Sequence, residues 1–194
     1  MLQWPSDIRP SNMSWRLLSN SVSFQSPFNG ATQTVTFPGS QWVAELSFEN
    51  INDWESRQLE ALIADLDGMG GRILIHDFGR WGRAPAGKPV VRGDANTGKV
   101  LATQGWTPER KILWRGDYIS IDNELKMITQ DVWSGLDGSA ILPVAPMLRT
   151  VPQAGTPIET ANPRGVFRLS DNENGVDRQP AFNNNVSLKF VEAF

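Results

Sequence analysis

The stretch Gln41-Trp42-Val43-Ala44-Glu45-Leu46-Ser47-Phe48 carries the clearest structural signal in the chain, an alternation of apolar and less apolar residues with a period of two. Successive side chains of a β-strand point to opposite faces of the sheet. The pattern therefore predicts a strand with one core-facing side. The residues on that side are Trp42, Ala44, Leu46 and Phe48.

The residues before this stretch continue the β-pattern. Ranges 14–24 and 32–37 predict two shorter strands. Between them lies Ser26-Pro27-Phe28-Asn29-Gly30, in which the proline and the Asn-Gly pair supply turn geometry. The N-terminal part of the chain is therefore predicted to be a β-meander.

A helix is predicted after the stretch, from about Trp54 to Leu66. Asn52 precedes it, with Glu55 three residues further on, which predicts a capping box at its start. Apolar residues recur with the i, i+3, i+4, i+7 spacing of one helical stripe. They are Leu59, Leu62, Ile63 and Leu66.

The rest of the chain alternates short apolar segments with turn signals, which favours β-structure. Because a terminal strand is stable only when it is paired, we expect the last strand to return to the N-terminal sheet. The predicted fold class is mainly β: a β-sandwich with one α-helix plus a second small β-barrel or β-sandwich domain. Strands are predicted at 72–76, 99–103, 111–115, 117–121, 125–133, 139–145, 165–169 and 186–191.

This pattern predicts two domains, the first of them discontinuous. Residues 1–78 and 164–194 are predicted to form the N-terminal β-sandwich with the helix, and residues 99–150 the second β-domain. Residues 79–98 are rich in Gly, Pro and Arg and predict a loop or linker, and residues 151–163 predict a Pro-rich linker. Both connections are long, and we expect them to reach neighbouring subunits.

Composition excludes several kinds of chemistry. The 194 residues include 18 basic and 21 acidic side chains, with a formal net charge of -3, no cysteine and one histidine. Disulfides, thiol nucleophiles and the usual zinc sites are therefore excluded, and we expect no cofactor and no metal site. The charge balance predicts no attraction to nucleic acid or to an anionic membrane. Without a membrane-spanning run or a signal peptide, we expect a soluble protein made in a cytoplasm.

Two motifs in the second half of the chain resemble binding sites and are interpreted as turns. Residues 93–99 match the start of a phosphate-binding P-loop, but Val100 stands where Ser or Thr must bind magnesium. Arg-Gly-Asp occurs at 92–94 and at 115–117, and turn-forming residues explain both occurrences.

Two further motifs resemble catalytic or metal sites. His76 beside Asp77 lacks the nucleophile elbow that would complete a triad, so we interpret it as structural or exposed. The oxygen-rich range 171–177 departs from the EF-hand spacing, so we interpret it as part of a solvated polar loop over 171–185. No catalytic residue is predicted.

The tryptophans and the arginines of the central segment supply the candidate interface residues. Trp42, Trp114 and Trp133, among the eight tryptophans, lie within strand patterns, which predicts burial. The other candidates lie near turns or strand starts, or in the basic segment that includes Lys88, where we favour a solvated loop that contacts protein over a nucleic-acid patch. The predicted interface residues are Trp4, Trp15, Arg80, Trp81, Arg83, Arg92 and Trp106.

The order of features along the chain is more specific than any one motif. In the first half the relevant segments are 15–16, 26–28, 39–46, the helix 55–66 and 70–72. In the second half they are 98–101, Leu113, 116–119, 124–126, 138–140, 146–149 and 190–194. Together they resemble the distal tail or minor tail proteins at the tail tip of long-tailed bacteriophages.

This resemblance implies a virion structural protein, not an enzyme, that forms a ring joining the tail tube to the baseplate hub. The implied partners are further copies of the chain, as a hexamer with a trimer as the alternative, the tail tube protein, and the baseplate hub and other tail-tip proteins. The implied location is the tail tip of the virion, after synthesis in the host cytoplasm.

Two other functions stay open from the residues themselves. The tryptophans are compatible with a carbohydrate-binding β-module for host-surface recognition, with Trp81 and Trp106 as the test positions. The 21 carboxylates are compatible with a glycoside hydrolase, which needs two facing carboxyl groups across a cleft.

Overall fold

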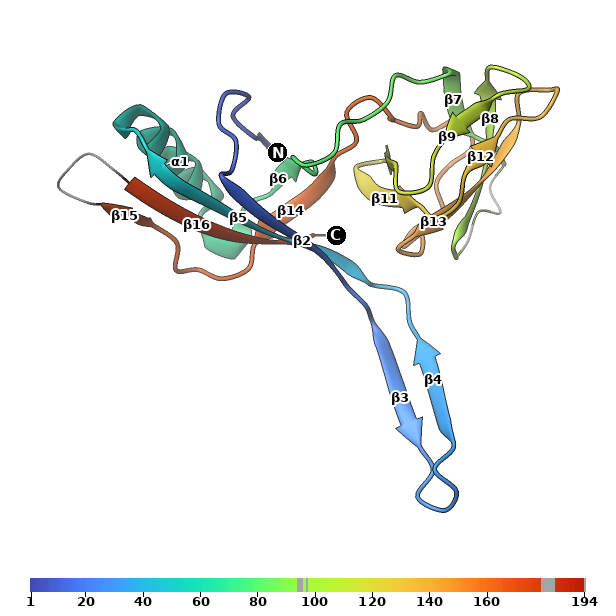
Figure 1. Ribbon diagram of the computed structural model, residues 1–194, viewed down its shortest axis with the longest axis horizontal. Coiled ribbons are helices and arrows are strands. Elements are labelled where there is room, and N and C mark those ends of the chain that lie inside the picture. The colour runs from blue at the N-terminus through green and yellow to red at the C-terminus, as the bar shows by residue number, and fades with distance from the viewer. Residues whose placement is uncertain (94–95, 97, 179–183, 194) are drawn as a thin grey trace.

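The computed structural model describes residues 1–93, 96, 98–178 and 184–193. Within these residues the chain is mainly β-structure, with a single α-helix, α1 (Asp53–Leu66), followed by a short 3-10 helix, η1 (Gly68–Gly70). Two lobes lie end to end, and a long hairpin projects from the region between them (Figure 1).

The first lobe is built on a sheet whose strands come from both ends of the chain. Its strands pair antiparallel except β1 and β6, which run parallel. The order is β1 (Leu2–Gln3), β6 (Ile73–Ile75), β14 (Gly165–Leu169), β16 (Asn184–Glu192), β5 (Gln41–Ile51) and β2 (Asn12–Leu18), with β15 (Val176–Arg178) beside β16.

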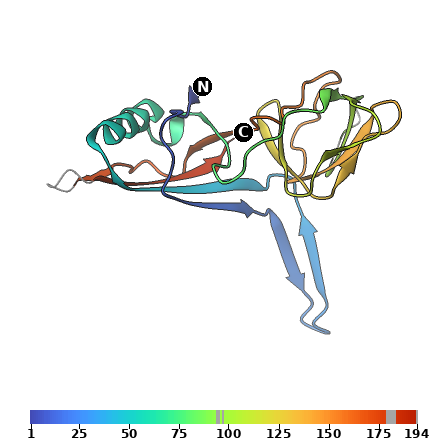
Figure 2. The same ribbon diagram turned by 45° about the horizontal axis from the view of Figure 1, so that its top comes forward.

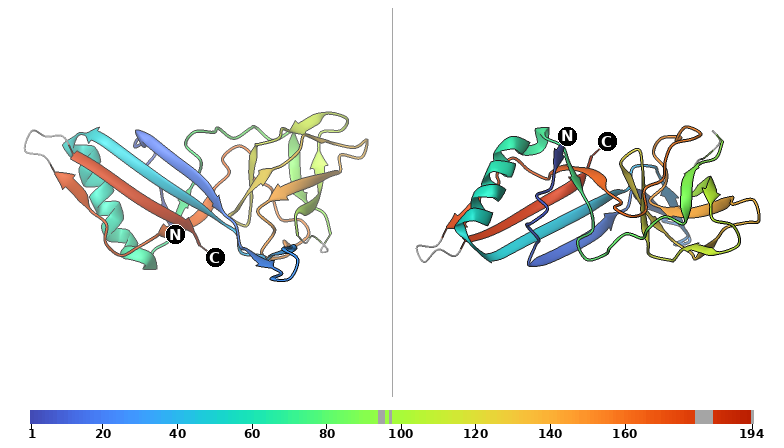
Figure 3. Two further views of the ribbon diagram at one scale, coloured as in Figure 1. Left: turned by 60° about the horizontal axis from the view of Figure 1, so that its bottom comes forward. Right: turned by 90° about the horizontal axis from the view of Figure 1, so that it is seen from above.

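Strand β5 confirms the predicted core-facing side. Trp42 is 4% exposed, and Ala44, Leu46 and Phe48 are 0% exposed. The intervening residues point to the other face, where Glu45 is exposed. Helix α1 lies across one face of this sheet (Figure 3). The alternation in the sequence therefore separates a covered face from an open one.

Helix α1 begins and packs as its sequence predicts. The side chain of Asn52 accepts a hydrogen bond from the Glu55 amide, and the Glu55 side chain accepts one from the Asn52 amide, which completes the capping box. Leu59, Leu62 and Leu66 are buried against the sheet. The helix is therefore anchored by one apolar stripe.

The last strand returns to the first lobe, as predicted. β16 pairs antiparallel with β5 over most of its length, so that Leu188 lies opposite Leu46 and Phe190 opposite Ala44. Its other side pairs with β14. Residues more than a hundred positions apart thus form the centre of one sheet.

The second lobe has its own sheet and its own apolar cluster. A short β9–β12 pair lies beside the sheet, and residues such as Leu101, Ile119 and Leu142 are 0% exposed inside the lobe. The strands are β10 (Tyr118–Ile121), β11 (Glu124–Ile128), β13 (Ala140–Ala145), β8 (Val100–Trp106) and β7 (Gly87–Val91) in sheet order, with β9 (Lys111–Leu113) and β12 (Val132–Trp133) separate.

The two predicted linkers are wrong in part. Residues 87–91, inside the predicted loop 79–98, form β7 and pair with β8. Residues 155–159, inside the predicted Pro-rich linker, exchange backbone hydrogen bonds with both β7 and β10, and Ile158 is buried. Proline lacks the amide that a ladder uses, which hides short edge segments from a periodicity search, although an edge tolerates it. Over these residues both connections pack on their own chain.

Two predicted strands are interrupted. The predicted strand 14–24 divides into β2 and β3 (Ser21–Gln25), and the predicted strand 125–133 divides into β11 and β12. In each case the apolar pattern continues through a change of direction, which local periodicity does not detect.

Candidate interaction surface on a projecting hairpin

The projecting hairpin consists of β3 and β4 (Thr32–Thr36), and residues 19–40 are called the arm below. It continues the hairpin that β2 and β5 begin: Leu18 pairs with Gln41 at the end of the first ladder, and Ser21 pairs with Thr36 at the start of the second. Figures 1 and 2 show the arm leaving the body at a bend and extending away from both lobes.

Hydrogen bonds fix the bend between the two ladders. The Phe37 amide donates to the Asn20 carbonyl at 2.8 Å, and the Asn20 side-chain amide donates to the Pro38 carbonyl at 2.9 Å. Gly39 has a φ of 110°, which an L side chain rarely adopts. The proline and the glycine interrupt the ladder, so the arm leaves the plane of the sheet at this point.

A buried ion pair holds the base of the arm. The Arg149 guanidinium donates to the Ser40 carbonyl at 3.0 Å and pairs with the carboxylate of Glu192. The same carboxylate accepts a hydrogen bond from the Trp42 amide at 3.1 Å. Arg149 belongs to the second lobe and Glu192 to the first, so the base of the arm is fixed where the lobes meet.

The tip of the arm is an ordered turn. The Ser26 amide donates to the Ala31 carbonyl at 2.8 Å, and the Asn29 side chain accepts from the Ala31 amide at 3.0 Å. Gly30 has a φ of 69°, the left-handed geometry that the sequence predicts for the Asn-Gly pair. Phe28, at this tip, is 97% exposed.

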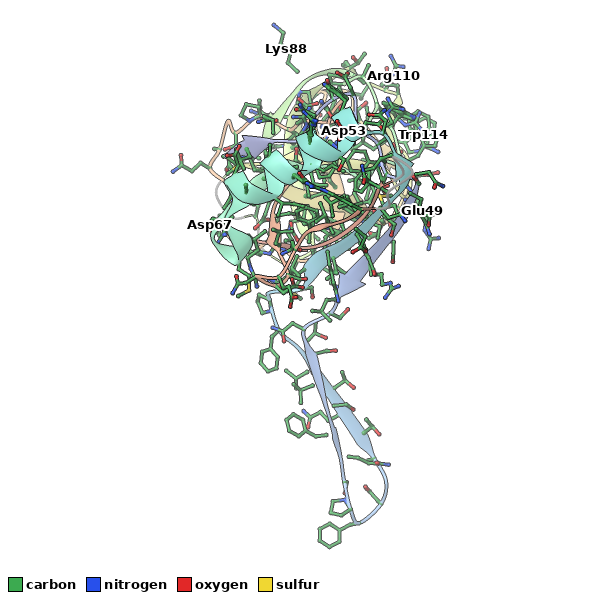
Figure 4. All side chains as sticks on the ribbon, turned by 90° about the vertical axis from the view of Figure 1, so that its left-hand side faces the viewer. Glu49, Asp53, Asp67, Lys88, Arg110 and Trp114 are labelled. Atoms are coloured by element: carbon green, nitrogen blue, oxygen red, sulfur yellow. The ribbon has the colours of Figure 1, made fainter. Side chains whose placement is uncertain are left out.

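The arm has one apolar and one polar face. Paired residues share a face, so Val22, Phe24, Val35 and Phe37 point to one side, together with Gln33, which pairs with Phe24. Phe24 is 59% exposed, Phe37 45% and Val22 44%. Figure 4 shows the rings along one side of the arm. The opposite face carries only serine, threonine and glutamine: Ser21, Ser23, Gln25, Thr32, Thr34 and Thr36.

The composition of the arm fits contact with another protein. No charged residue occurs between Arg16 and Glu45, although 20% of the whole chain is charged. An isolated two-stranded hairpin is marginally stable in water, and an exposed edge strand without charges is prone to pair with another chain. Exposed apolar faces of this kind mark interaction sites. The arm is therefore the strongest candidate interaction surface in the described part of the chain.

Three of the predicted interface tryptophans lie in a core or against one instead. Trp106 is 3% exposed and donates through its indole nitrogen to Thr103, so its prediction as an exposed anchor is wrong. Trp4 stacks on Phe48 with a centroid distance of 5.8 Å. Trp15 is half-buried against the first-lobe cluster. Each lies near a strand start or turn in sequence, but the neighbouring sheet covers it.

Two predicted interface arginines connect the central segment to the second lobe. Arg83 pairs with Asp117 at 2.8 Å, and its guanidinium lies 3.8 Å from the centroid of Trp114. Arg80 donates to the Gly116 carbonyl at 2.9 Å. Because these contacts stay within the chain, neither arginine extends freely towards a neighbour.

The remaining two predicted interface residues are exposed. Trp81 is 76% exposed, with the Arg9 guanidinium 4.8 Å from its ring centroid. Arg92 is exposed and lines a groove of about 620 Å³ on the second lobe, together with Trp133 and Ile141. The predicted residues therefore occupy separate places and do not form one site.

The burial predicted for the strand tryptophans is correct for Trp42 and wrong for two others. Trp133 is 64% exposed and Trp114 is 37% exposed. Trp133 lies in β12 and Trp114 directly follows β9, two strands that form a pair separate from the five-stranded sheet, and the Trp114 ring is covered by the Arg83 and Lys111 side chains. Trp81 and the buried Trp106 share no surface, which removes the basis for a sugar-stacking platform built on that pair.

Parts of three short motifs lie outside the described residues. They are Asp94, Ala95 and Thr97 of the P-loop-like range 93–99, Asp94 of the first Arg-Gly-Asp, and residues 179–183 of the polar loop. In the second Arg-Gly-Asp, Asp117 accepts from the Trp114 amide and pairs with Arg83, as a turn residue does. No group of three or more metal-ligating side chains occurs among the described residues.

Burial and neighbouring charges shift the pKa of two groups near the cores. Burial, together with the Arg164 charge, lowers the pKa of His76, whose ring packs 4.4 Å from that of Phe78. Burial also lowers the pKa of Lys126, which is 0% exposed, pairs with Glu124 at 3.0 Å and donates to the Met147 carbonyl. Burial in a packed environment and neighbouring charges account for both pKa shifts.

Two surface carboxyl groups have lowered pKa values. A hydrogen bond from Lys111 lowers the pKa of Asp131, and hydrogen bonds from Ser139 lower that of Asp137. A general acid of a glycoside hydrolase needs the opposite direction. These two side chains are therefore unsuited to that role.

Sequence reasoning predicted the strands of the arm but missed its exposed phenylalanines as a candidate site. The signal was present in the sequence. Val22 and Phe24 precede the Asn-Gly turn, Val35 and Phe37 follow it, and serine and threonine alternate with them. All lie in the stretch between Arg16 and Glu45, which has no charged residue. The apolar face of an antiparallel hairpin is commonly packed on other parts of a protein.

Comparison with known proteins adds no assignment: no protein-family model matches the chain, and no curated protein matches it either. Among the described residues, no helix has the length and apolar character needed to cross a membrane.

Proposed function

We propose that this chain is a virion structural protein of the tail tip of a long-tailed bacteriophage and that it assembles into a ring between the tail tube and the baseplate hub. One observation carries the assembly part of the proposal: an ordered, uncharged hairpin projects from the body with an exposed apolar face. The phage part rests on the resemblance of the sequence to tail-tip proteins.

The energetics of the arm favour a bound state. Each valine or phenylalanine side chain contributes about 1.5–3 kcal/mol when it is fully buried. Phe28 is 97% exposed, Phe24 59% and Phe37 45%, so about half or more of this contribution is not realised while they face water. A subunit that docks its arm on a neighbour gains it on assembly, and binding energy concentrates in such aromatic side chains.

The finer architecture belongs to the same proposal. We propose a β-sandwich that carries one helix, formed by 1–78 and 164–194, and a second small β-barrel or sandwich around 99–150. The bonds from residues 155–159 to both β7 and β10 support a barrel, because they connect the two edges of the second sheet.

The proposed partners follow the resemblance: copies of the chain in a sixfold ring, with a threefold ring as the alternative, the tail tube protein and the hub. Two lobes of fixed orientation suit such a subunit, since Arg149 of one pairs with Glu192 of the other in a buried position. A ring subunit needs a rigid body and a projecting contact element.

The test has two measurements. Light scattering of the purified chain over a range of concentrations is expected to give the mass of a closed oligomer, and labelled antibodies against the chain are expected to mark the tail tip in electron micrographs of virions. A strict monomer at every concentration, together with virions that lack the chain, would refute the proposal.

A further inference from the structure

A second exposed apolar face lies on the second lobe. Ile141 pairs with Ala102, and Pro143 pairs with Val100, so these four residues share the outer side of β8 and β13. Ile141 is 67% exposed and Val100 is 50% exposed, whereas Leu101 and Leu142 on the inner side are 0% exposed. The groove beside this face is lined by Trp133. The outer face of the second sheet is therefore open to solvent.

This outer face matches the arm in charge and in length. Neither β8 nor β13 contains a charged residue, and the arm contains none, whereas the groove beside β13 is also lined by Arg92 and Asp131. The strands of the arm have five residues each, about 17 Å at about 3.3 Å per residue. β8 has seven residues and β13 six, which spans about 20–23 Å. Two such faces fit the geometry of aligned sheet packing.

The two faces of one chain are held apart. The arm points away from both lobes, and its base is fixed by the Asn20 and Arg149 hydrogen bonds (Figure 1). Phe24 remains 59% exposed in the single chain. The two uncharged apolar faces cannot contact each other within one chain. They can bury each other when two chains meet.

We propose that the arm of one copy packs its apolar face on the outer face of the second sheet of a second copy, an inference that rests on the self-assembly proposed above. Phe24 and Phe37 lie against Ile141, Pro143 and Trp133 of that copy. Such a contact joins two different surfaces, so each copy offers one arm and one receiving face. Head-to-tail contacts of this kind close into a ring or extend into a filament.

Cross-linking between cysteine variants tests the contact directly, because the chain has no cysteine of its own. Phe24→Cys and Ile141→Cys are made in separate chains, mixed, and treated with a short bismaleimide. A mixed dimer is expected, with about tenfold more product than from the control mixture of Thr34→Cys and Ile141→Cys, since Thr34 lies on the polar face of the arm.

The outcomes separate this inference from the proposed function. A mixed dimer restricted to the Phe24→Cys mixture supports the contact. Phe24→Cys chains that link to one another without Ile141→Cys show an arm-to-arm contact and overturn it. Oligomers of full mass without any mixed product also overturn it but leave the ring standing. A chain that is monomeric throughout overturns this inference and the self-assembly on which it rests, and the antibody labelling of virions then decides the rest of the proposed function.

Added charge provides a second measurement that does not depend on cross-linking geometry. Phe24→Glu and Ile141→Glu are each expected to weaken self-association by about 30-fold or more, as loss of an interface hot spot does. Thr34→Glu places the same charge on the polar face and is expected to keep the oligomeric mass. Equal association of all three variants with the parent chain would overturn the contact. Circular dichroism checks that each variant keeps its fold.

Discussion

The β2–β5 ladder and the arm are two halves of one long hairpin, and they differ in what covers them. Both alternate apolar and polar residues with a period of two. In the first half, Leu46 and Phe48 are 0% exposed beneath α1, whereas Phe24 in the second half is 59% exposed. The bend at Asn20 and Pro38 marks the change. The same local pattern thus appears once inside a core and once in water.

The difference shows that a strand pattern specifies which side of a strand is apolar. It does not specify which segment packs on that side. In the first half the cover comes from the same chain, through α1 and the pairing with β16. In the second half Phe24 stays 59% exposed in the single chain, and we propose that a partner supplies the cover. Substitutions in the two halves should therefore affect different quantities: stability of the single chain in one, and assembly in the other.

The largest expected effect is on the covered half. Leu46→Ala removes a fully buried side chain, and we expect the free energy of unfolding to fall by about 2–5 kcal/mol, through lost burial and the cavity left behind. Urea denaturation at a concentration where the parent chain is dissociated measures it. Phe24→Ala is the control, and its expected change is within about 0.5 kcal/mol, as for other exposed positions. Equal losses for both would remove the distinction between the halves.

The next effect concerns the tip of the arm. Gly30 has a φ of 69° and open space around it, so the cost of Gly30→Val is a backbone cost of about 1–2 kcal/mol. We expect faster amide exchange along β3 and β4 with unchanged protection in β5. Ala31→Val adds the same side chain at the adjacent exposed position and should leave exchange unchanged. Loss of protection in β5 would show that the halves fold as one unit.

A smaller effect distinguishes two asparagines of the same chemistry. Asn52 and Asn29 each accept a backbone amide through the side-chain oxygen, one at the start of α1 and one at the tip of the arm. Asn52→Ala should lower the free energy of unfolding by about 1 kcal/mol, because it removes a helix cap above the covered half. Asn29→Ala should change only local exchange in the arm. The reverse result would place the cooperative unit in the arm.

The smallest effect is a pH dependence restricted to the body. Burial and the Arg164 charge hold the pKa of His76 below 6.5 in the folded chain, so the unfolded chain binds more protons as the pH falls through 6.5. The contribution of neutral His76 to the free energy of unfolding is therefore fully present above pH 6.5 and is lost as the pH falls below it. His76→Phe should remove this part of the decline in urea titrations. The arm has no charged side chain or histidine, so its exchange should not depend on pH beyond the intrinsic rate.

Local patterns were enough to predict many of the elements. The apolar stripe of α1 with its capping box, the buried side of β5 and the return of the last strand all follow from residue spacing. The predictions for the edge segments were wrong, because β7 and residues 155–159 contain prolines and pair with only a few residues. The predicted exposure of individual tryptophans was also wrong in places. Trp106 is buried although its position near a turn predicted exposure, and Trp133 is exposed although its strand pattern predicted burial.

The sequence by itself determined most of the strands, the helix and its cap, the turn at Asn29-Gly30 and the alternation of the arm, because each depends on residues within a few positions of one another. Only the tertiary structure decided which faces are covered. Leu46 is buried in one cluster with the α1 leucines and with its partner Leu188, more than a hundred positions away, while the bend at Pro38 carries β3 and β4 beyond both lobes (Figure 1). Burial is a property of distant segments brought together, and no local pattern contains it.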